Sequence, residues 1–479
     1  MTVQSSSFYA VLQCFSLCFT EPSFQNLVSI AVGWIICRER HTITGPVRVV
    51  LALGVQRHHS VFYRFFSKAA WVPDALGRAL FDQLQPFIPG PIVEALADDT
   101  LGRKTGPHIW GAGMHHDAVA SSYGRHTGSP RHVAFAFGHS WVIVGVWVPL
   151  PWSPLKGVAI PLLFRLYRSK KLCPSHEYRK RTELALELVQ ILEKWVTNVG
   201  RKLIVTGDSE YACRTIVKRL PAMTHFIGPV VMNAALFKVP DPWTPSGKRG
   251  RGAPRKRGDR LPTPKQLLSD RSRPWVKITA TLYGRSVPIL VKTLVCQWYQ
   301  VAGLRPVRIV LTRDPKRRID DRAFFSTDSE MTTDQVLSRF SHRWSLEVTF
   351  FNVKQHFGLE HPQNGWGYLK NRRRSKKRAG PQPRGNKGQK AAQRTTPSIF
   401  YLFGLVYVWY FKYGNPERDV AIARRLAPWN TRKTEPSFKD MLDALRRELI
   451  SSPELYMHPD HERVMQQFGA VAEPLMATG

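Results

Sequence analysis

The spacing of hydrophobic residues changes along the chain and separates helical from extended regions. In residues 1–92, apolar side chains recur at intervals of three and four residues, which is typical of amphipathic helices. These positions are Phe24, Leu27, Val28, Ile30 and Ala31, followed by Val61, Phe62, Phe65 and Phe66. The pattern therefore predicts an N-terminal helical domain.

From residue 93 to 167 the pattern becomes β-like, and residues 132–151 are expected to form a hairpin about Gly138–Ser140. A helix is predicted over residues 176–198, where Leu184, Leu188, Ile191 and Trp195 are the apolar positions. A strand at 203–208, a helix at 211–220 and a strand at 225–227 are expected to follow. This order, three antiparallel strands and then helix, strand, helix and strand, indicates an α/β protein with an RNase H-like core.

Carboxylates follow two of these expected strands. The run VEALADDT at residues 93–100 ends in Asp98 and Asp99, and the run LIVTGD at 203–208 ends in Asp208. Open α/β sheets place their chemistry at strand ends. A single aspartate in such a place is often only a turn or helix-cap residue.

A third carboxylate lies in residues 340–354, FSHRWSLEVTFFNVK. Helical spacing places Arg343, Glu347 and Lys354 on one face, with Phe340 on the same stripe. One carboxylate between two cations on an aromatic helix suggests a site for metal and phosphate. The alternative is a half-buried helix with an internal salt bridge.

These three segments resemble the catalytic motifs of DDE transposases from bacterial insertion sequences, in the group with a Y-x2-R-x3-E-x6-K signature. Arg343, Glu347 and Lys354 match the signature in identity, and Phe340 stands where the family has tyrosine. The triplet DDT at 98–100 resembles the first aspartate motif, and GDSEY at 207–211 resembles the second. The similarity covers roughly residues 90–415.

The resemblance implies phosphodiester hydrolysis and strand transfer with two Mg²⁺ (or Mn²⁺) ions, for which carboxylates are suitable ligands. Asp98 would bridge the ions, and Asp208 and Glu347 would each hold one. Asp99 is the rival of Asp98, because adjacent strand residues point to opposite faces. Arg343 and Lys354 would hold phosphates near the scissile bond.

Far more residues lie between Asp208 and Glu347 than a return to the core needs, so a folded insertion is expected. Alternating runs at 276–284, 287–300 and 305–314 predict a small antiparallel sheet, and the resembling transposases carry an insertion at this point. Trp243, Trp275 and Trp298 in the insertion are candidates to stack on a flipped base, or else core aromatics.

These patterns divide the chain into five regions. They are an N-terminal helical domain predicted to bind DNA (1–92), a first core part (93–228), a β-rich insertion (229–315), a second core part with a basic loop at 370–394 (316–425), and a C-terminal helical region (426–479). The alternative for residues 1–92 is a helical brace on the core.

The charge agrees with a nucleic-acid partner. The chain has 70 Lys and Arg against 35 Asp and Glu, a formal net charge of +35, which favours a polyphosphate ligand. Two basic blocks are predicted to bind DNA phosphates, and the second, without acidic residues, is expected to be disordered without a ligand. Their basic candidates are Lys248, Arg249, Arg251, Arg255, Lys256 and Arg257 in residues 248–260, and Arg372, Arg373, Arg374, Lys376 and Lys377 in residues 370–394. Solvated linkers or tails are the alternative.

Six cysteines without metal-ligand spacing favour a reduced, cytoplasmic protein. No targeting segment is expected, and the apolar run Ile399–Phe411 is too short to span a bilayer, which predicts a buried helix. The expected function is that of a bacterial, nucleoid-associated transposase that acts on terminal inverted repeats and target DNA, as a homodimer in the DNA complex. The alternatives are a domesticated or inactive relative that only binds DNA, and an RNase H-like host nuclease.

Overall fold

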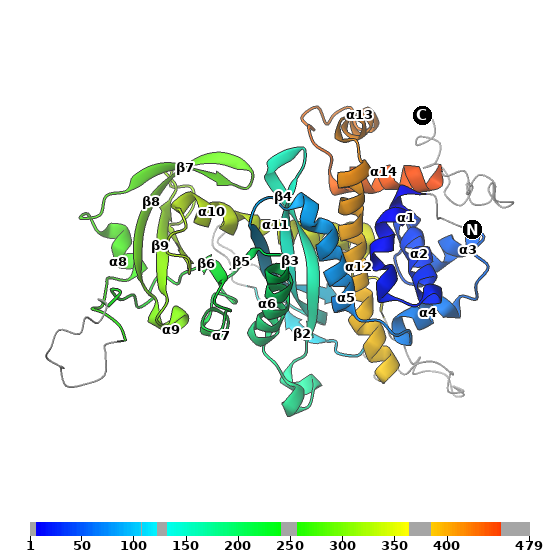
Figure 1. Ribbon diagram of the computed structural model, residues 1–479, viewed down its shortest axis with the longest axis horizontal. Helices are drawn as coiled ribbons and strands as arrows, with labels where there is room; N and C mark the ends of the chain where they lie inside the picture. The colour runs from blue at the N-terminus through cyan, green and yellow to red at the C-terminus, as the bar shows by residue number, and fades with distance from the viewer. Residues whose placement is uncertain (1–5, 107, 122–131, 241–255, 364–384, 452–479) are drawn as a thin grey trace.

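The computed structural model describes residues 6–106, 108–121, 132–240, 256–363 and 385–451. In these residues ten strands form one mixed sheet, in the order β2-β3-β1-β5-β6-β10-β9-β8-β7, with β4 also paired to β3. Helices cover the sheet, and the N-terminal helices lie at one end of the elongated molecule (Figure 1). The protein is thus a mixed α/β structure, as the sequence predicts.

The core half of the sheet contains the expected elements. Strands β1 (Ile92–Arg103), β3 (Phe135–Leu150) and β4 (Ser153–Tyr167) are antiparallel, with the short β2 (Gly113–His116) beside β3. Helix α6 (Arg181–Asn198) then leads to β5 (Lys202–Gly207), which is parallel to β1. The short α7 (Arg214–Val217) leads to β6 (Thr224–Pro229), parallel to β5. From the helix at α6 onward this is the predicted order, whereas the strands before it differ from the prediction.

The predicted hairpin about Gly138–Ser140 is wrong, because β3 continues through these residues. The turn lies instead between β3 and β4, after Leu150. Gly138 is paired with Arg103 and Gly113, and a Cβ atom there would lie 2.3 Å from the carbonyl oxygen of Gly102. This glycine therefore permits close approach of two strands and does not form a turn.

Strands are present where the alternating runs after residue 275 predict them. Helix α8 (Pro264–Ser269) precedes β7 (Val276–Leu282) and β8 (Arg285–Gln297), and the short α9 (Tyr299–Ala302) leads to β9 (Pro306–Arg313). Strand β10 (Arg322–Ser326) pairs with β9 on one side and with β6 on the other. The insertion strands are consequently an extension of the core sheet and not a separate small sheet.

The N-terminal region is helical, with α1 (Ser7–Leu12), α2 (Glu21–Ile36), α3 (Thr44–Ala52), α4 (Ser60–Ser67) and α5 (Pro73–Leu84). Its buried side chains join the same hydrophobic core as β1, β3 and β4. The Trp34 indole donates to the carbonyl oxygen of Phe357, and Arg446 donates to that of Ile35. These contacts agree with the interpretation of a brace, whereas DNA binding by this region stays a prediction.

Helix α12 (Asn386–Tyr413) runs along the N-terminal helices and is almost entirely buried from Thr395 to Tyr410 (Figure 1). This confirms a buried helix at Ile399–Phe411. In the described part of the chain no helix is long and apolar enough to cross a membrane. Helices α13 (Pro416–Leu426) and α14 (Phe438–Ile450) follow.

Helix α12 also corrects the prediction that the second basic block is disordered throughout. The last residues of the basic block, 386–394, form the first turns of α12. Arg394 is 7% exposed and donates to the carbonyl oxygens of Phe66 and Trp71, so it links α12 to the N-terminal helices and is not a free phosphate ligand. Residues 370–384, with the five basic candidates of this block, lie outside the described residues.

Candidate active site

The register of the two central strands places the two aspartate motifs side by side. Strand β5 pairs in parallel with β1, and the last pair is Ala97 with Gly207. Asp98 and Asp208 are the next residue on each strand, so both lie at the same level of the sheet. One Asp208 carboxylate oxygen accepts hydrogen bonds from the backbone N–H groups of Glu210 and Tyr211, which fixes the turn after β5.

The predicted single helix over residues 340–354 is divided into α10 (Thr333–His342) and α11 (Trp344–Phe357), with Arg343 at the junction. Phe340 belongs to α10 and packs on Phe324 of β10, at 4.5 Å between ring centroids. It therefore lies in the hydrophobic layer under the insertion strands, away from the charged residues of α11. A tyrosine hydroxyl is not needed for this packing.

Arg343 joins the carboxylates of β1 and α11. One of its terminal nitrogens lies 2.8 Å from an Asp98 oxygen, and the other lies 2.7 Å from a Glu347 oxygen. Helix α11 is held on the sheet by Thr349, whose hydroxyl donates to the carbonyl oxygen of Ala159 in β4. The structure thus brings Asp98 together with Arg343 and Glu347, and places Asp208, just after β5, beside Asp98. The expectation that the first strand ends at its two aspartates is wrong, because β1 continues to Arg103 and Asp98 lies in its middle.

Asp99 faces the other side of the sheet. Its carboxylate accepts a 3.4 Å hydrogen bond from the buried Tyr211 hydroxyl and lies 3.7 Å from Arg181 at the start of α6. Arg181 also lies 3.7 Å from Glu210. Of the two adjacent aspartates, Asp98 shares a partner with Glu347.

The burial of these carboxylates has a clear electrostatic consequence. Burial raises the pKa of Asp98 to about 7; the Arg343 guanidinium opposes this shift, and the charges of Asp208 and Asp99 add to it. Burial likewise raises the pKa of Asp99, against the effect of Arg181. Negative charge is concentrated here in a poorly solvated place, and this favours cations.

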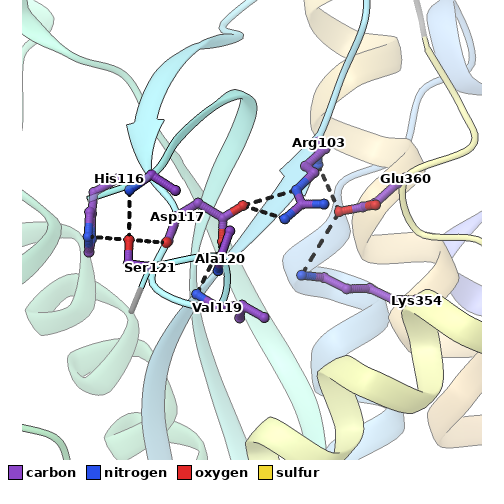
Figure 2. A network of polar contacts seen from close by, with 9 residues as sticks. Arg103, His116, Asp117, Val119, Ala120, Ser121, Lys354 and Glu360 are labelled. Atoms are coloured by element: carbon purple, nitrogen blue, oxygen red, sulfur yellow. Dashed lines mark hydrogen bonds and ion pairs between the residues drawn. The ribbon is translucent and has the colours of Figure 1, made fainter. Parts of the chain in front are cut away.

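Lys354 lies further along α11, in a second polar network (Figure 2). Its ammonium group is 4.0 Å from Glu360, and the same Glu360 oxygen accepts a hydrogen bond from the backbone N–H of Arg103. The Arg103 side chain pairs with Asp117 at 2.6 Å. Burial lowers the pKa of Lys354, although Glu360 opposes the shift.

Glu94 is part of the site's support and was missed from the sequence. It is paired with Arg339 at 2.9 Å and with a His342 ring nitrogen at 2.8 Å, and the His342 ring stacks on Trp147 at 3.8 Å. Glu94 and Asp98 are four residues apart in β1 and so share a face. The alternation of side chains along the strand could therefore have placed Glu94 on the same face as Asp98. Arg181 had no such signal, because its contact with Asp99 depends on how α6 packs.

The described tryptophans of the insertion do not lie where they could stack on a flipped base. Trp298 is 4% exposed, and its ring meets Phe325 edge-on at 5.2 Å, so it has no free face for a base. It is a core residue, the alternative given above. Trp275 lies under Arg313, at 4.1 Å from guanidinium to ring, and Trp243 lies outside the described residues.

Only the end of the first basic block is described. Lys256 and Arg257 are exposed, and the Arg257 guanidinium lies 5.0 Å from the centre of the Phe237 ring. The remaining candidates of that block, Lys248, Arg249, Arg251 and Arg255, are outside the described residues, as are Arg372, Arg373, Arg374, Lys376 and Lys377.

The donor set suits a divalent cation in its chemistry, because Asp98, Asp208 and Glu347 offer hard carboxylate oxygens in a region of excess negative charge. The positions of the described side chains, however, do not form a metal site. Within the described ranges, no three His, Cys, Asp or Glu side chains converge closely enough to hold an ion. Arg343 lies between Asp98 and Glu347 and pairs with both, so one positive charge stands between two carboxylates.

Comparison with solved structures gives a weak likeness. A piggyBac transposase, in a synaptic complex with hairpin DNA, is similar with a TM-score of 0.40 and 11% sequence identity. The alignment covers 98% of this chain and 86% of that one. A likeness at this level carries no argument about function. No curated protein matches the chain in sequence.

The family comparison is stronger. Residues 14–284 match the family model described as DDE superfamily endonuclease. The match covers more than half of the chain, includes both aspartate motifs, and ends before Glu347. The chain belongs to the DDE superfamily of endonucleases.

Proposed function

We propose that this endonuclease is a transposase that cuts and joins DNA at the terminal inverted repeats of an insertion sequence. The observation that carries the proposal is that Asp98 of β1 and Glu347 of α11 share Arg343, with Asp208 beside Asp98 after the neighbouring strand β5. The strand order β4-β3-β1-β5-β6, with β5 and β6 parallel to β1, supports an RNase H-like core.

In this proposal Asp98, Asp208 and Glu347 hold Mg²⁺ or Mn²⁺. When bound, such ions activate the attacking hydroxyl and stabilise the leaving 3′-oxygen. The chain's own residues position the DNA: Arg343 supplies a planar fork that matches a phosphate, and Lys354 supplies a point charge further along α11. Asp98 is preferred over Asp99 because it shares Arg343 with Glu347.

The DNA path proposed here runs from Arg343 past Lys354. Arg103, next to Lys354 in the second polar network, has an exposed side chain and extends this line of positive charge (Figure 2). A net charge of +35 supports nonspecific attraction to duplex DNA. Two copies of the chain would act on the two ends of the element.

The test is cleavage of a labelled duplex that carries the repeat flanking the gene, with Mg²⁺ or with a chelator. We expect the wild-type protein to nick this duplex only with Mg²⁺. Glu347→Gln keeps size and hydrogen bonding but removes a charge, so it should abolish nicking and still bind the duplex. Glu177→Gln is the matched control, because this half-exposed residue pairs with Arg168, outside the site.

Each other outcome assigns a different function. Nicking by Glu347→Gln at the wild-type rate would remove Glu347 from the mechanism. A wild-type protein that binds repeat ends but never nicks them would be a DNA-binding relative without transposition. Cutting of the RNA strand in an RNA–DNA hybrid, with repeat ends left intact, would indicate an RNase H-like nuclease.

A further inference from the structure

The position of Arg343 raises a question that the proposed function leaves open. Two of its nitrogens are bound to Asp98 and Glu347, the carboxylates proposed to hold a cation. The third nitrogen, Nε, is buried and has no hydrogen-bond partner among the described residues. The guanidinium therefore donates a hydrogen bond to Asp98 and pairs with Glu347, while its Nε remains unsatisfied.

The backbone of Arg343 is fixed while its side chain is long and adaptable. The preceding turn of α10 is anchored by Arg339 and His342 on Glu94, and the ring of His342 stacks on Trp147. The following turns of α11 are anchored by Thr349 on β4. A change of partner at this junction thus requires rotation of the Arg343 side chain and no movement of either helix.

The two carboxylates share a single internal cation in this arrangement. No three acidic or other ligating side chains converge to hold an ion in the described parts of the chain, and Asp98 and Glu347 share one internal cation. A guanidinium binds a phosphate in the same forked geometry in which it binds carboxylates. A DNA backbone phosphate, which carries one negative charge and accepts the same forked geometry, therefore offers Arg343 an alternative partner.

We propose that Arg343 is an internal counter-ion that closes the carboxylate site, and that a DNA backbone phosphate opens the site by drawing the guanidinium away. The inference rests on the proposed function and adds its regulation. It means that DNA and a divalent cation bind with positive coupling. The coupling is reciprocal, because each ligand must change the affinity for the other by the same factor.

The test is direct measurement of Mn²⁺ binding by electron paramagnetic resonance, with no cleavage needed. Free wild-type protein should bind Mn²⁺ weakly, and addition of a short duplex with the repeat should tighten binding by about 10-fold or more. Arg343→Gln removes the internal cation, so it should bind Mn²⁺ about as tightly without DNA as the wild type does with it. Melting temperatures of both proteins check that the variant is folded.

Two further variants test whether the gain in Mn²⁺ affinity is specific to this site. Arg343→Gln combined with Glu347→Gln should lose the gain, because a carboxylate ligand is missing. Arg165→Gln is the matched control: Arg165 also bridges two carboxylates, Asp74 and Glu187, at 2.8 Å each. Glu187 keeps Arg179 as a second partner, so no new Mn²⁺ site should form there.

The outcomes separate this inference from the proposed function. Tight Mn²⁺ binding by free wild-type protein, lost in Glu347→Gln, would overturn the role of Arg343 and leave the metal site intact. An equal gain in Arg165→Gln would also overturn it, since any freed carboxylate pair would then suffice. No Mn²⁺ binding in Arg343→Gln or in the DNA complex would instead contradict the proposed metal-dependent function.

Discussion

Asp98 and Asp99 are neighbours in β1, yet their carboxylates have partners on opposite faces of the sheet: Arg343 for Asp98, and Tyr211 and Arg181 for Asp99. This separation gives the two residues different expected roles. Asp98 lies with Glu347, whereas Asp99 belongs to a polar group that holds α6 and the turn after β5. The difference is open to a direct test.

Asp98→Asn should lower Mg²⁺-dependent nicking of repeat ends by about 10²-fold or more, as is typical when a charged group that acts on the transition state is removed. Asp99→Asn should keep most of the nicking rate, because its amide still accepts from Tyr211. Initial rates at saturating DNA check both variants. The reverse order of effects would make Asp99 the first ligand.

The sequence predicted the neighbouring aspartates of β1 and β5 because their signals are local, although β1 continues beyond Asp98. A β-branched run followed by an aspartate marks Asp208, and an apolar run ending in two aspartates marks Asp98. Local sequence could not decide between Asp98 and Asp99, because the decision depends on which face of the sheet is covered by α11. The break at Arg343 was missed for a similar reason: periodicity continues through it, and only packing on β1 and β10 divides the helix.

Other differences also arise from long-range contacts. Gly138 was interpreted as a turn, but its missing side chain admits the backbone of Gly102. Residues 386–394 have the composition of a disordered basic segment, and they are helical because Arg394 binds carbonyl groups of Phe66 and Trp71. In both places the partner lies far away in sequence or is a backbone atom, neither of which a pattern of residue types can specify.

Glu94 should contribute strongly to stability. Its carboxylate is 17% exposed and pairs with Arg339 and His342, so Glu94→Gln leaves a buried guanidinium without its counter-charge. We expect a loss of about 3 kcal/mol in the free energy of unfolding, measured by urea titration. The exposed pair of Asp82 with Arg78 is the comparison, and Asp82→Asn should cost less than about 1 kcal/mol. Equal costs would contradict the anchoring role of Glu94.

Acid should destabilise the protein through His139. Burial lowers its pKa to about 3, while the unfolded chain has an ordinary histidine pKa. Between these two values the unfolded state binds a proton that the folded state does not, so stability falls as pH decreases below about 6.5. The ring's Nε2 lies 2.8 Å from the carbonyl oxygen of Trp110, a bond that a glutamine amide can replace.

His139→Gln therefore serves to isolate this effect. The slope of unfolding free energy against pH, between pH 6 and 4, should decrease by about 1.4 kcal/mol per pH unit, the value for one proton. His41 and His115, both with a pKa lowered to about 4 by burial, should maintain the rest of the slope. An unchanged slope in the variant would show that His139 does not stay neutral in the folded protein.

Glu360 should weaken DNA binding in the wild-type protein. Its carboxylate occupies the position between Lys354 and the Arg103 backbone where a phosphate would be bound, and it competes for the same cation (Figure 2). Glu360→Gln keeps an acceptor for the backbone N–H and removes the charge. Affinity for duplex DNA should rise about two- to fivefold in a filter or anisotropy assay, the range of a partly exposed ion pair. Glu177→Gln is the matched control, and a decrease for Glu360→Gln would mean that Glu360 orders a DNA-binding loop instead.

The basic blocks should account for much of the salt dependence of DNA binding. Replacing their lysines and arginines with glutamine at residues 248–257 and 372–377 should lower the slope of log affinity against log salt by about 0.9 for each DNA phosphate that the protein no longer neutralises. Affinity should fall on repeat and unrelated duplexes alike, because phosphate contacts position the protein without reading sequence. Residues 386–394 must be left intact, since Arg394 binds the N-terminal helices and its replacement would destabilise the fold. The same replacement at the exposed Arg424 and Arg425 of α13 controls for the loss of surface charge, and an equal decrease for each charge removed would show that the blocks have no special place on the DNA path.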